Sequence, residues 1–577
     1  RIVACLAAML MGACPVLAGQ APQGPSGAQA AYQRGQDDVE RGDLAAARTD
    51  FEEAIRVAPE DEDAHVSLGR VLAALGDWEG AEQQLRAAVK IDPEAAVARM
   101  SLGGVLVQRG DVAEAETESR EALKLAPENA DAHRLLGRIL SLRGSKDEAG
   151  SEMRRAVELA PDRADLRDDL GSVFAQQGDF ASASASFAEA LRLQPTFGPA
   201  HYHLGVTRLQ QHQYDEAAVE LRKAVAVTPG DAAAHYYLAE ALTGQSKSAE
   251  ALQESQTAAQ LRPDWFEAQI VYGLASQHAG DAASAVAAFE QAIKLRPGDP
   301  DAYNDLGLAL IQKGDAESSI PRFREAVRLR PGDGTIRGNL GIAFLQRADF
   351  DAAIVELDAA VHLAPSNASL HYNLGLAYKL KDAFDQAVVE LQKAIQLDPG
   401  LADAHYTLGV LYWQKGEFEP ATEQLKSAIQ VHAGYAEAYY TLGTVYKQQG
   451  KLQDAAGALR EAIRLQPDFA GAHTTLAAVL RQLGDNEHAS EEAKAAAKIT
   501  ATTNNLQGAM FATNSGKRLL DAGDIEGAIG QFRAAIKMSD GYAPAHYQLS
   551  QALQRKGDSA EAQEELKRWQ ELESAKP

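Results

Sequence analysis

Cysteine is almost absent from this chain of 577 residues. Cys5 and Cys14 are the two copies, so no disulfide framework supports the rest of the chain. Basic residues are scarce relative to acidic ones: 56 Lys and Arg against 81 Asp and Glu give a formal charge of −25. This charge repels phosphate backbones, and no basic run with interleaved aromatics offsets it, which argues against nucleic-acid binding. Aromatic residues make up only 6% while alanine is abundant, a composition that favours helix over sheet.

Long apolar segments are absent after residue 18. Residues 2–18 read IVACLAAMLMGACPVLA, which is typical of the hydrophobic region of a secretory signal. No later run is apolar and long enough to span a bilayer. We therefore expect a signal peptide over residues 1–18, cleaved after Ala18, followed by a flexible tether over residues 19–27.

A lipoprotein signal is the alternative. Residues 11–14, MGAC, resemble a lipobox and would make Cys14 the lipidated residue, although Pro15 directly after it argues against this. Either signal predicts an exported protein, located in the periplasm or outside the cell, with a lipid anchor to the envelope as the alternative.

A glycine that recurs at a fixed interval of about 34 residues organises the remaining chain. Five extra residues are inserted after the fourteenth copy, and two further copies follow, which gives sixteen units in all. It runs through Gly35, Gly69, Gly103, Gly137, Gly171, Gly205, Ala239, Gly273, Gly307, Gly341, Gly375, Gly409, Gly443 and Ala477, and continues at Gly516 and Ser550. We expect repeats 1–14 over residues 28–503, an insertion that breaks the register at 504–508, and repeats 15–16 with a capping helix over 509–577.

Each unit predicts two amphipathic helices, because apolar and small residues recur at helical spacing. Gly-Asp pairs such as Gly76-Asp77 supply a left-handed stop for the first helix and an N-cap for the second. A proline such as Pro59 closes most units and ends the second helix. Residues 498–515 lack this proline and contain the register shift, so we expect either a hinge or an elongated loop there.

These positions closely resemble the tetratricopeptide repeat (TPR), a helix-turn-helix unit of about 34 residues. The resemblance covers about residues 28–577. It implies an all-α fold, a right-handed superhelical solenoid of antiparallel helix pairs, whose first helices line a concave groove that holds peptides, helices or whole proteins.

Aromatic residues recur at the position that should face this groove in the family geometry. With a tryptophan and two lysines one turn and more along the same helix surface, they form our candidate partner-binding site. The candidates are Tyr202, Tyr236, Tyr372, Tyr406, Tyr440, Trp413, Lys379 and Lys447. The alternative is that the tyrosines merely seal gaps between successive first helices.

Histidine recurs four residues before the glycine position. Copies in neighbouring helix pairs lie too far apart to share a zinc ion, so we expect packed structural side chains and no metal site. The copies are His65, His133, His201, His235, His371, His405, His473 and His546.

Catalysis finds no support in the sequence. There is no Gly-rich phosphate loop, no haem-attachment motif and no nucleophile elbow, and no cofactor is expected. We therefore expect a non-catalytic scaffold or adaptor for protein or peptide partners. Two alternatives are a subunit that associates end to end into extracellular filaments, and an accessory subunit of an envelope enzyme or polysaccharide-export complex.

Overall fold

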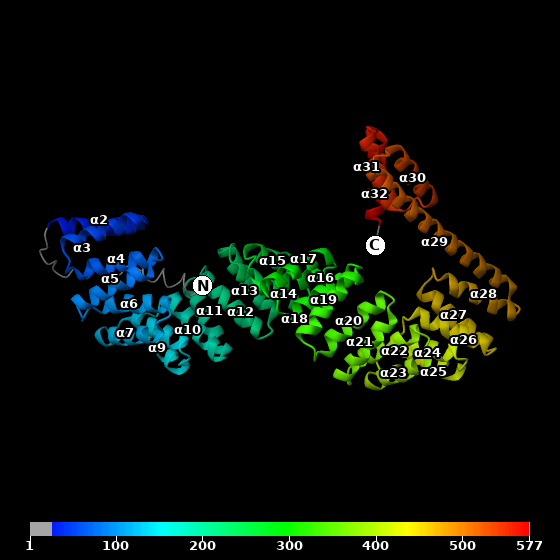
Figure 1. Cartoon of the computed structure of the whole chain (residues 1–577), viewed down its shortest axis with the longest axis horizontal. Coiled ribbons are helices and arrows are strands. Elements are labelled where there is room, and N and C mark those ends of the chain that lie inside the picture. The colour runs from blue at the N-terminus through cyan, green and yellow to red at the C-terminus, as the bar shows by residue number, and fades with distance from the viewer. Residues whose placement is uncertain (1–25, 576–577) are drawn as a thin grey trace. The chain divides into compact units, whose positions relative to one another are not determined.

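The computed structural model describes residues 26–575, and within this range every regular element is an α-helix. The described chain falls into two compact units, which meet in sequence between Lys313 and Gly314. Figure 1 shows the helices following one another as neighbours within each unit. The fold class predicted from the sequence, an all-α solenoid of antiparallel helix pairs, is confirmed.

The helices of the first unit are α2 (Ser26–Arg41), α3 (Leu44–Val57), α4 (Glu62–Ala74), α5 (Trp78–Ile91), α6 (Ala96–Arg109), α7 (Val112–Leu125), α8 (Ala130–Leu142), α9 (Lys146–Leu159), α10 (Ala164–Gln177), α11 (Phe180–Leu193), α12 (Gly198–Gln210), α13 (Tyr214–Val227), α14 (Ala232–Gly244), α15 (Ser248–Leu261), α16 (Phe266–His278), α17 (Ala282–Leu295) and α18 (Pro300–Gln312).

The helices of the second unit are α19 (Ala316–Leu329), α20 (Gly334–Gln346), α21 (Phe350–Leu363), α22 (Ala368–Leu380), α23 (Phe384–Leu397), α24 (Ala402–Gln414), α25 (Phe418–Val431), α26 (Ala436–Gln448), α27 (Leu452–Leu465), α28 (Ala470–Gln482), α29 (Asn486–Asp521), α30 (Ile525–Met538), α31 (Ala543–Lys556) and α32 (Ser559–Ser574).

The turn inside each pair has the predicted chemistry. Gly76 adopts φ +84° after α4, a left-handed conformation that costs glycine little. Asp77 then caps α5, because its carboxylate accepts a hydrogen bond from the Gly80 N–H at 2.9 Å. Where the glycine of this turn is replaced, the chain keeps the same conformation with another residue, as at Ala348 with φ +60°.

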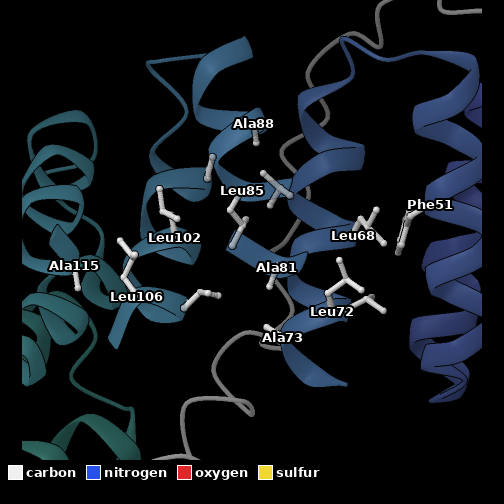
Figure 2. Packing of buried hydrophobic residues seen from close by; sticks show 14 of the residues in the cluster. Phe51, Leu68, Leu72, Ala73, Ala81, Leu85, Ala88, Leu102, Leu106 and Ala115 are labelled. Atoms are coloured by element: carbon white, nitrogen blue, oxygen red, sulfur yellow. The ribbon is translucent and has the colours of Figure 1, made fainter. Parts of the chain in front are cut away.

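The two helices of a pair approach closely because the recurring glycine has no side chain. A Cβ added at Gly69 in α4 would lie 2.7 Å from Cγ of Leu85 in α5. Leu85 is fully buried. It belongs to a continuous core that joins successive pairs, and Figure 2 shows Leu85 and Ala81 between the helices that carry Leu68 and Leu102.

Successive pairs are joined mainly by the packing of each second helix on the following first helix, and the first helices of successive pairs also contact one another. In the first unit, α4 contacts α6 and α6 contacts α8, while in the second unit α20 contacts α22 and α22 contacts α24. The second helices of the described pairs do not pack on one another in this way. Within each unit the first helices therefore lie on the inner side of the stack, and we call the surface they form the inner face.

The segment without a closing proline forms neither a loop nor a break. Residues 504–508, which carry the register shift, lie inside α29, a single helix of 36 residues. The expectation of an elongated loop at 498–515 is therefore wrong. Its physical reason is visible in the sequence: Ala501 occupies the slot that holds Pro467 one unit earlier, so nothing stops the helix.

The signal peptide expected over residues 1–18, with its cleavage point and the alternative lipidation at Cys14, lies outside the described residues. So does most of the tether expected over 19–27, of which Ser26 and Gly27 already belong to α2. Among the described helices, none combines the length and the apolar character that a membrane span requires.

Candidate functional site on the inner face

The tyrosines predicted to face the groove are all half-buried. Each stands on a first helix, three residues before the recurring glycine. Tyr202 and Tyr236 belong to α12 and α14 of the first unit, and Tyr372, Tyr406 and Tyr440 to α22, α24 and α26 of the second. Their rings are thus partly covered by neighbouring side chains, and those neighbours decide what remains for a partner.

Three of these tyrosines stack on an aromatic residue of the following pair. The pairs are Tyr236 with Trp265, Tyr406 with Tyr435, and Tyr440 with Phe469, and their ring centroids lie 4.8 to 4.9 Å apart. This separation is favourable for aromatic packing. In each of these ring pairs, the second residue is the N-cap residue of the first helix in the following repeat. Sequence analysis missed these partners, although their recurrence two residues after the unit's closing slot was a visible signal.

The remaining candidates of the second unit are held by similar contacts. Tyr406 and Trp413 pack against the same core cluster, and the indole Nε1 of Trp413 donates to Oε1 of Gln448 at 2.7 Å. Lys379, at the position equivalent to Trp413, is half-buried, and this burial lowers the pKa of its ammonium group. Lys447 occupies the same position in α26 and is also half-buried.

A hollow of about 510 Å³ opens on the inner face of the first unit, among α8, α10 and α12. This volume is within the range of pockets that hold small ligands or one large side chain. We call it the α10 hollow. Its apolar lining includes Leu135, Ile139, Leu142, Val173, Phe197 and Tyr202. Of the residues predicted from the sequence, only Tyr202 contributes to it.

Charged groups of both signs form one wall of the α10 hollow. Arg134 is 7% exposed, and its guanidinium donates to Asp165 at 2.6 Å and to Asp169. Beside them, Oδ1 of Asp168 lies 2.9 Å from Nδ1 of His203. Burial raises the pKa of Asp168, while His203 opposes this shift. Because Arg134 and Asp168 are buried, their charges act more strongly than on an open surface.

Arg134 and Asp168 occupy the positions that hold Tyr202 and Tyr236 in the next two pairs. The regular inner-face position therefore changes from charged to aromatic over the four repeats from Arg134 to Tyr236. Because a single repeat pattern does not reveal which neighbours meet, the sequence analysis passed over both residues. The signal that could have found them is a charged residue at this position in two consecutive repeats.

The recurring histidines are structural, as predicted. All eight are buried, with 3 to 8% exposure. Each Nδ1 lies 2.5 to 2.8 Å from a Gln or Glu oxygen of its own second helix. Each Nε2 lies 2.8 to 3.2 Å from a carbonyl oxygen of the preceding turn. We call this arrangement the histidine bracket. The side-chain partners are Gln84, Glu152, Glu220, Glu254, Glu390, Gln424, Glu492 and Glu565, and the carbonyls belong to Pro59, Pro127, Pro195, Pro229, Pro365, Pro399, Pro467 and Asp540.

A histidine bracket ties together the first helix and the second helix of one pair and the turn that leads into this pair from the preceding repeat. Both ring nitrogens are thereby occupied, and the described residues contain no group of three or more His, Cys, Asp or Glu side chains placed to hold a metal ion.

Comparison with solved structures finds many helical-repeat proteins. The Cut9–Hcn1 hetero-tetramer of the APC/C aligns over 79% of this chain and 97% of its own, at 15% identity and a TM-score of 0.37. YrrB, described as a TPR protein with an unusual peptide-binding site, aligns over 34% and 97%, at 26% identity and 0.28. Pseudomonas aeruginosa pilF aligns over 36% and 94%, at 23% identity and 0.34. No curated protein sequence matches the chain.

Family models match most of the chain. A tetratricopeptide repeat model matches residues 32–96, 100–164, 169–221, 202–266, 273–334, 406–468 and 440–503. A TPR repeat model matches 341–382 and 381–416, and a further tetratricopeptide repeat model matches 519–574. Proteins of this kind are generally non-catalytic interaction scaffolds that bind peptides or proteins. Together with the regular succession of helix pairs, these matches place the chain in the tetratricopeptide repeat family.

Proposed function

We propose that this protein is a non-catalytic scaffold of sixteen repeats that binds a peptide or protein partner on its inner face. The observation that carries the proposal is the α10 hollow, an apolar recess with a charged wall on the face formed by successive first helices. Stacked repeats hold such a surface in place before the partner arrives, which reduces the ordering cost of binding.

The lining of the α10 hollow indicates how a partner would engage it. Leu135, Ile139 and Val173 offer a floor for one apolar side chain. The wall around Arg134 and Asp169 offers hydrogen-bonding groups for polar atoms beside that side chain. An extended peptide segment with an apolar residue between polar neighbours has this combination.

The experiment is co-purification of partners from the native cell envelope with the tagged full chain, followed by variants. Leu142 lines the α10 hollow and is 49% exposed, so Leu142→Glu places a charge in the recess without unfolding α8. Leu125→Glu is the matched control, because Leu125 is 41% exposed at the end of α7 and is not among the lining residues. We expect Leu142→Glu to reduce capture about tenfold or more. Equal capture by both variants would remove the α10 hollow from the proposal.

The aromatic residues of the second unit are a further part of the proposed surface. Tyr406→Ala combined with Trp413→Ala removes two half-buried rings that pack on one cluster. We expect weaker capture of the partner with unchanged helix content by circular dichroism. Unchanged capture would assign these rings to sealing the joint between repeats, which is the role their stacking contacts already support.

We also propose that the chain is exported by a bacterial cell through residues 1–18. Mass spectrometry of the mature protein tests this proposal. A first residue at Gly19 supports a cleaved signal, a lipid-modified first residue at Cys14 supports the lipoprotein alternative, and an uncleaved chain in the cytoplasm contradicts export.

A further inference from the structure

An open stacking surface follows from the course of α29 through the second unit. The N-terminal part of α29 packs against α28, as the second helix packs against the first in every other repeat. The helix then continues straight, so no following helix covers the α28–α29 pair. A hollow of about 550 Å³ remains there, which we call the α29 hollow. It is lined by Thr474, Ala477, Arg481, Ala493, Ala496, Ala497, Thr500, Ala501 and Asn504.

Equivalent surfaces elsewhere in the solenoid are closed by a small residue. An alanine of the second helix packs on an alanine of the next first helix, and both are fully buried. Examples are Ala54 with Ala64, Ala190 with Ala200, and Ala535 with Ala545. In the repeat register, Ala496 occupies the position of the second-helix alanine, and Phe511 occupies the position of the alanine in the next first helix. At this joint the surface is open, and the Phe511 side chain is 72% exposed.

The residues of the α29 joint are complementary in size. The preceding unit places Leu459 and Ile463 at positions where the α29 hollow has Ala493 and Ala497. Conversely, Phe511 stands where the interior units have a smaller side chain. The joint thus has small side chains on the side of the α29 hollow and a large one at Phe511, and close-packed interfaces combine large and small side chains in this way.

Phe511 cannot reach the α29 hollow of its own chain while α29 is intact. Ala496 and Phe511 are fifteen residues apart on one helix, which corresponds to about 22 Å along the axis. Closing the joint within one chain would require breaking the helix around Ala501, where the usual proline is absent. A second copy of the chain meets neither obstacle.

The hollow and Phe511 share one stripe of α29. Residues 493, 497, 500, 504, 507 and 511 alternate in spacing by four and three, which places them along the same side of a helix. In two antiparallel α29 helices that cross near residue 502, Phe511 of each copy faces Ala493 of the other. Such an arrangement is a closed, two-fold symmetric interface.

We propose that two copies of this protein pair through α29 in antiparallel orientation, with Phe511 of each copy inserted into the α29 hollow of the other. The contact continues the packing that joins repeats elsewhere in the solenoid, and it buries the most exposed large apolar side chain among the described residues.

Light scattering coupled to size-exclusion chromatography tests the pairing on the full chain. We expect the wild type at micromolar concentration to have twice the 61.6 kDa mass of one chain. Phe511→Asp removes two apolar contacts per dimer and should raise the dissociation constant about a hundredfold. Val355→Asp is the matched control, since Val355 is 65% exposed on α21 in the same unit. A monomeric wild type, or a Phe511→Asp variant that dimerises as tightly as the control, would overturn the proposal.

Disulfide trapping then identifies the surface. Ala497→Cys and Gln507→Cys are combined in a chain whose Cys5 and Cys14 are replaced by serine. The two new cysteines lie about 15 Å apart along an intact α29, too far for a bond within one chain. A covalent dimer on oxidation, absent from either single-cysteine variant, is the expected result. A disulfide formed within one chain, or no disulfide at all, would contradict the antiparallel contact.

Discussion

Replacing Gly341 by alanine in α20 tests how the helix pairs of this solenoid are packed. The added Cβ would lie 2.5 Å from Cγ of Leu357 in α21, a side chain that is fully buried. Overpacking of this kind costs about 1 to 3 kcal/mol, while alanine gains about 1 kcal/mol over glycine in a helix interior. We therefore expect a net loss of up to about 2 kcal/mol in the free energy of unfolding.

The sign of this effect should reverse when Leu357 is also replaced by alanine. Leu357→Ala alone leaves a cavity and costs about 2 to 5 kcal/mol. In that background the methyl group of Gly341→Ala fills part of the cavity, so the double variant should be more stable than Leu357→Ala by about 1 kcal/mol. The chain already contains such a pair, because Ala477 and Ala493 occupy the equivalent positions in the unit of α28.

Hydrogen–deuterium exchange of peptides from α20 and α21 measures the change locally, which suits a repeat protein whose units unfold in groups. Gly457→Ala provides the control, since Gly457 lies on α27 with nothing near its added Cβ. It should stabilise its helix by about 1 kcal/mol. If Gly341→Ala stabilised the protein as Gly457→Ala does, close helix approach would not explain the recurring glycine.

Four other substitutions test three separate features. Ala348 has φ +60°, so Ala348→Gly should raise the stability of its unit by about 1 kcal/mol in urea unfolding; a loss would refute strain at this turn. His371→Phe removes a histidine bracket and leaves Glu390 and the Pro365 carbonyl without their partner, which should cost about 1 to 3 kcal/mol. Glu390→Gln should cost far less, because two other brackets use glutamine, and equal losses would argue against the bracket. Burial raises the pKa of Asp305 from 3.8 to about 6, so the folded protein retains that proton more readily and loses stability as pH rises from about 4 through 6. Asp305→Asn should therefore be the more stable protein at pH 8, by about 1 kcal/mol after allowance for partial exposure, and should equal the wild type at pH 3.5; a variant less stable at pH 8 would contradict the shift.

The helix pairs could be predicted from the sequence because their signals are local. Gly76 and Asp77 end one helix and cap the next within two residues. The glycine at 69 and the leucine at 85 belong to the same pair, so one repeat length contains the whole contact. The structural role of the histidines could be inferred for the same reason, since every bracket closes within one helix pair and the turn directly before it.

Contacts between units could not be predicted in the same way. Tyr406 packs against Tyr435, which belongs to the next helix pair. The position that Tyr435 occupies holds different residue types in different repeats. Arg134 reaches Asp169, thirty-five residues further on, so neither residue alone indicates an ion pair. The sequence left open whether the inner-face tyrosines contact a partner or seal gaps between first helices, because the answer depends on which residue the following repeat supplies.

The course of α29 shows how a single missing residue changes the interpretation of a repeat. An absent proline and five extra residues suggested a hinge or an elongated loop. A loop needs residues that favour it, and the segment 498–508 contains only one glycine and no proline. With no proline to interrupt it, this segment continues the helix, because each added residue gains a backbone hydrogen bond without a new nucleation cost. Residues 501–507 are exposed for the same reason. The straight helix separates the pair that α29 forms with α28 from the pair that it forms with α30. Because α29 is straight, the α29 hollow and Phe511 are both uncovered, and the proposed dimer contact therefore depends on Ala501. Ala501→Pro restores the closing proline, so it should interrupt α29 and abolish the dimer. A dimer that survives Ala501→Pro would show that an unbroken α29 is not what presents this surface.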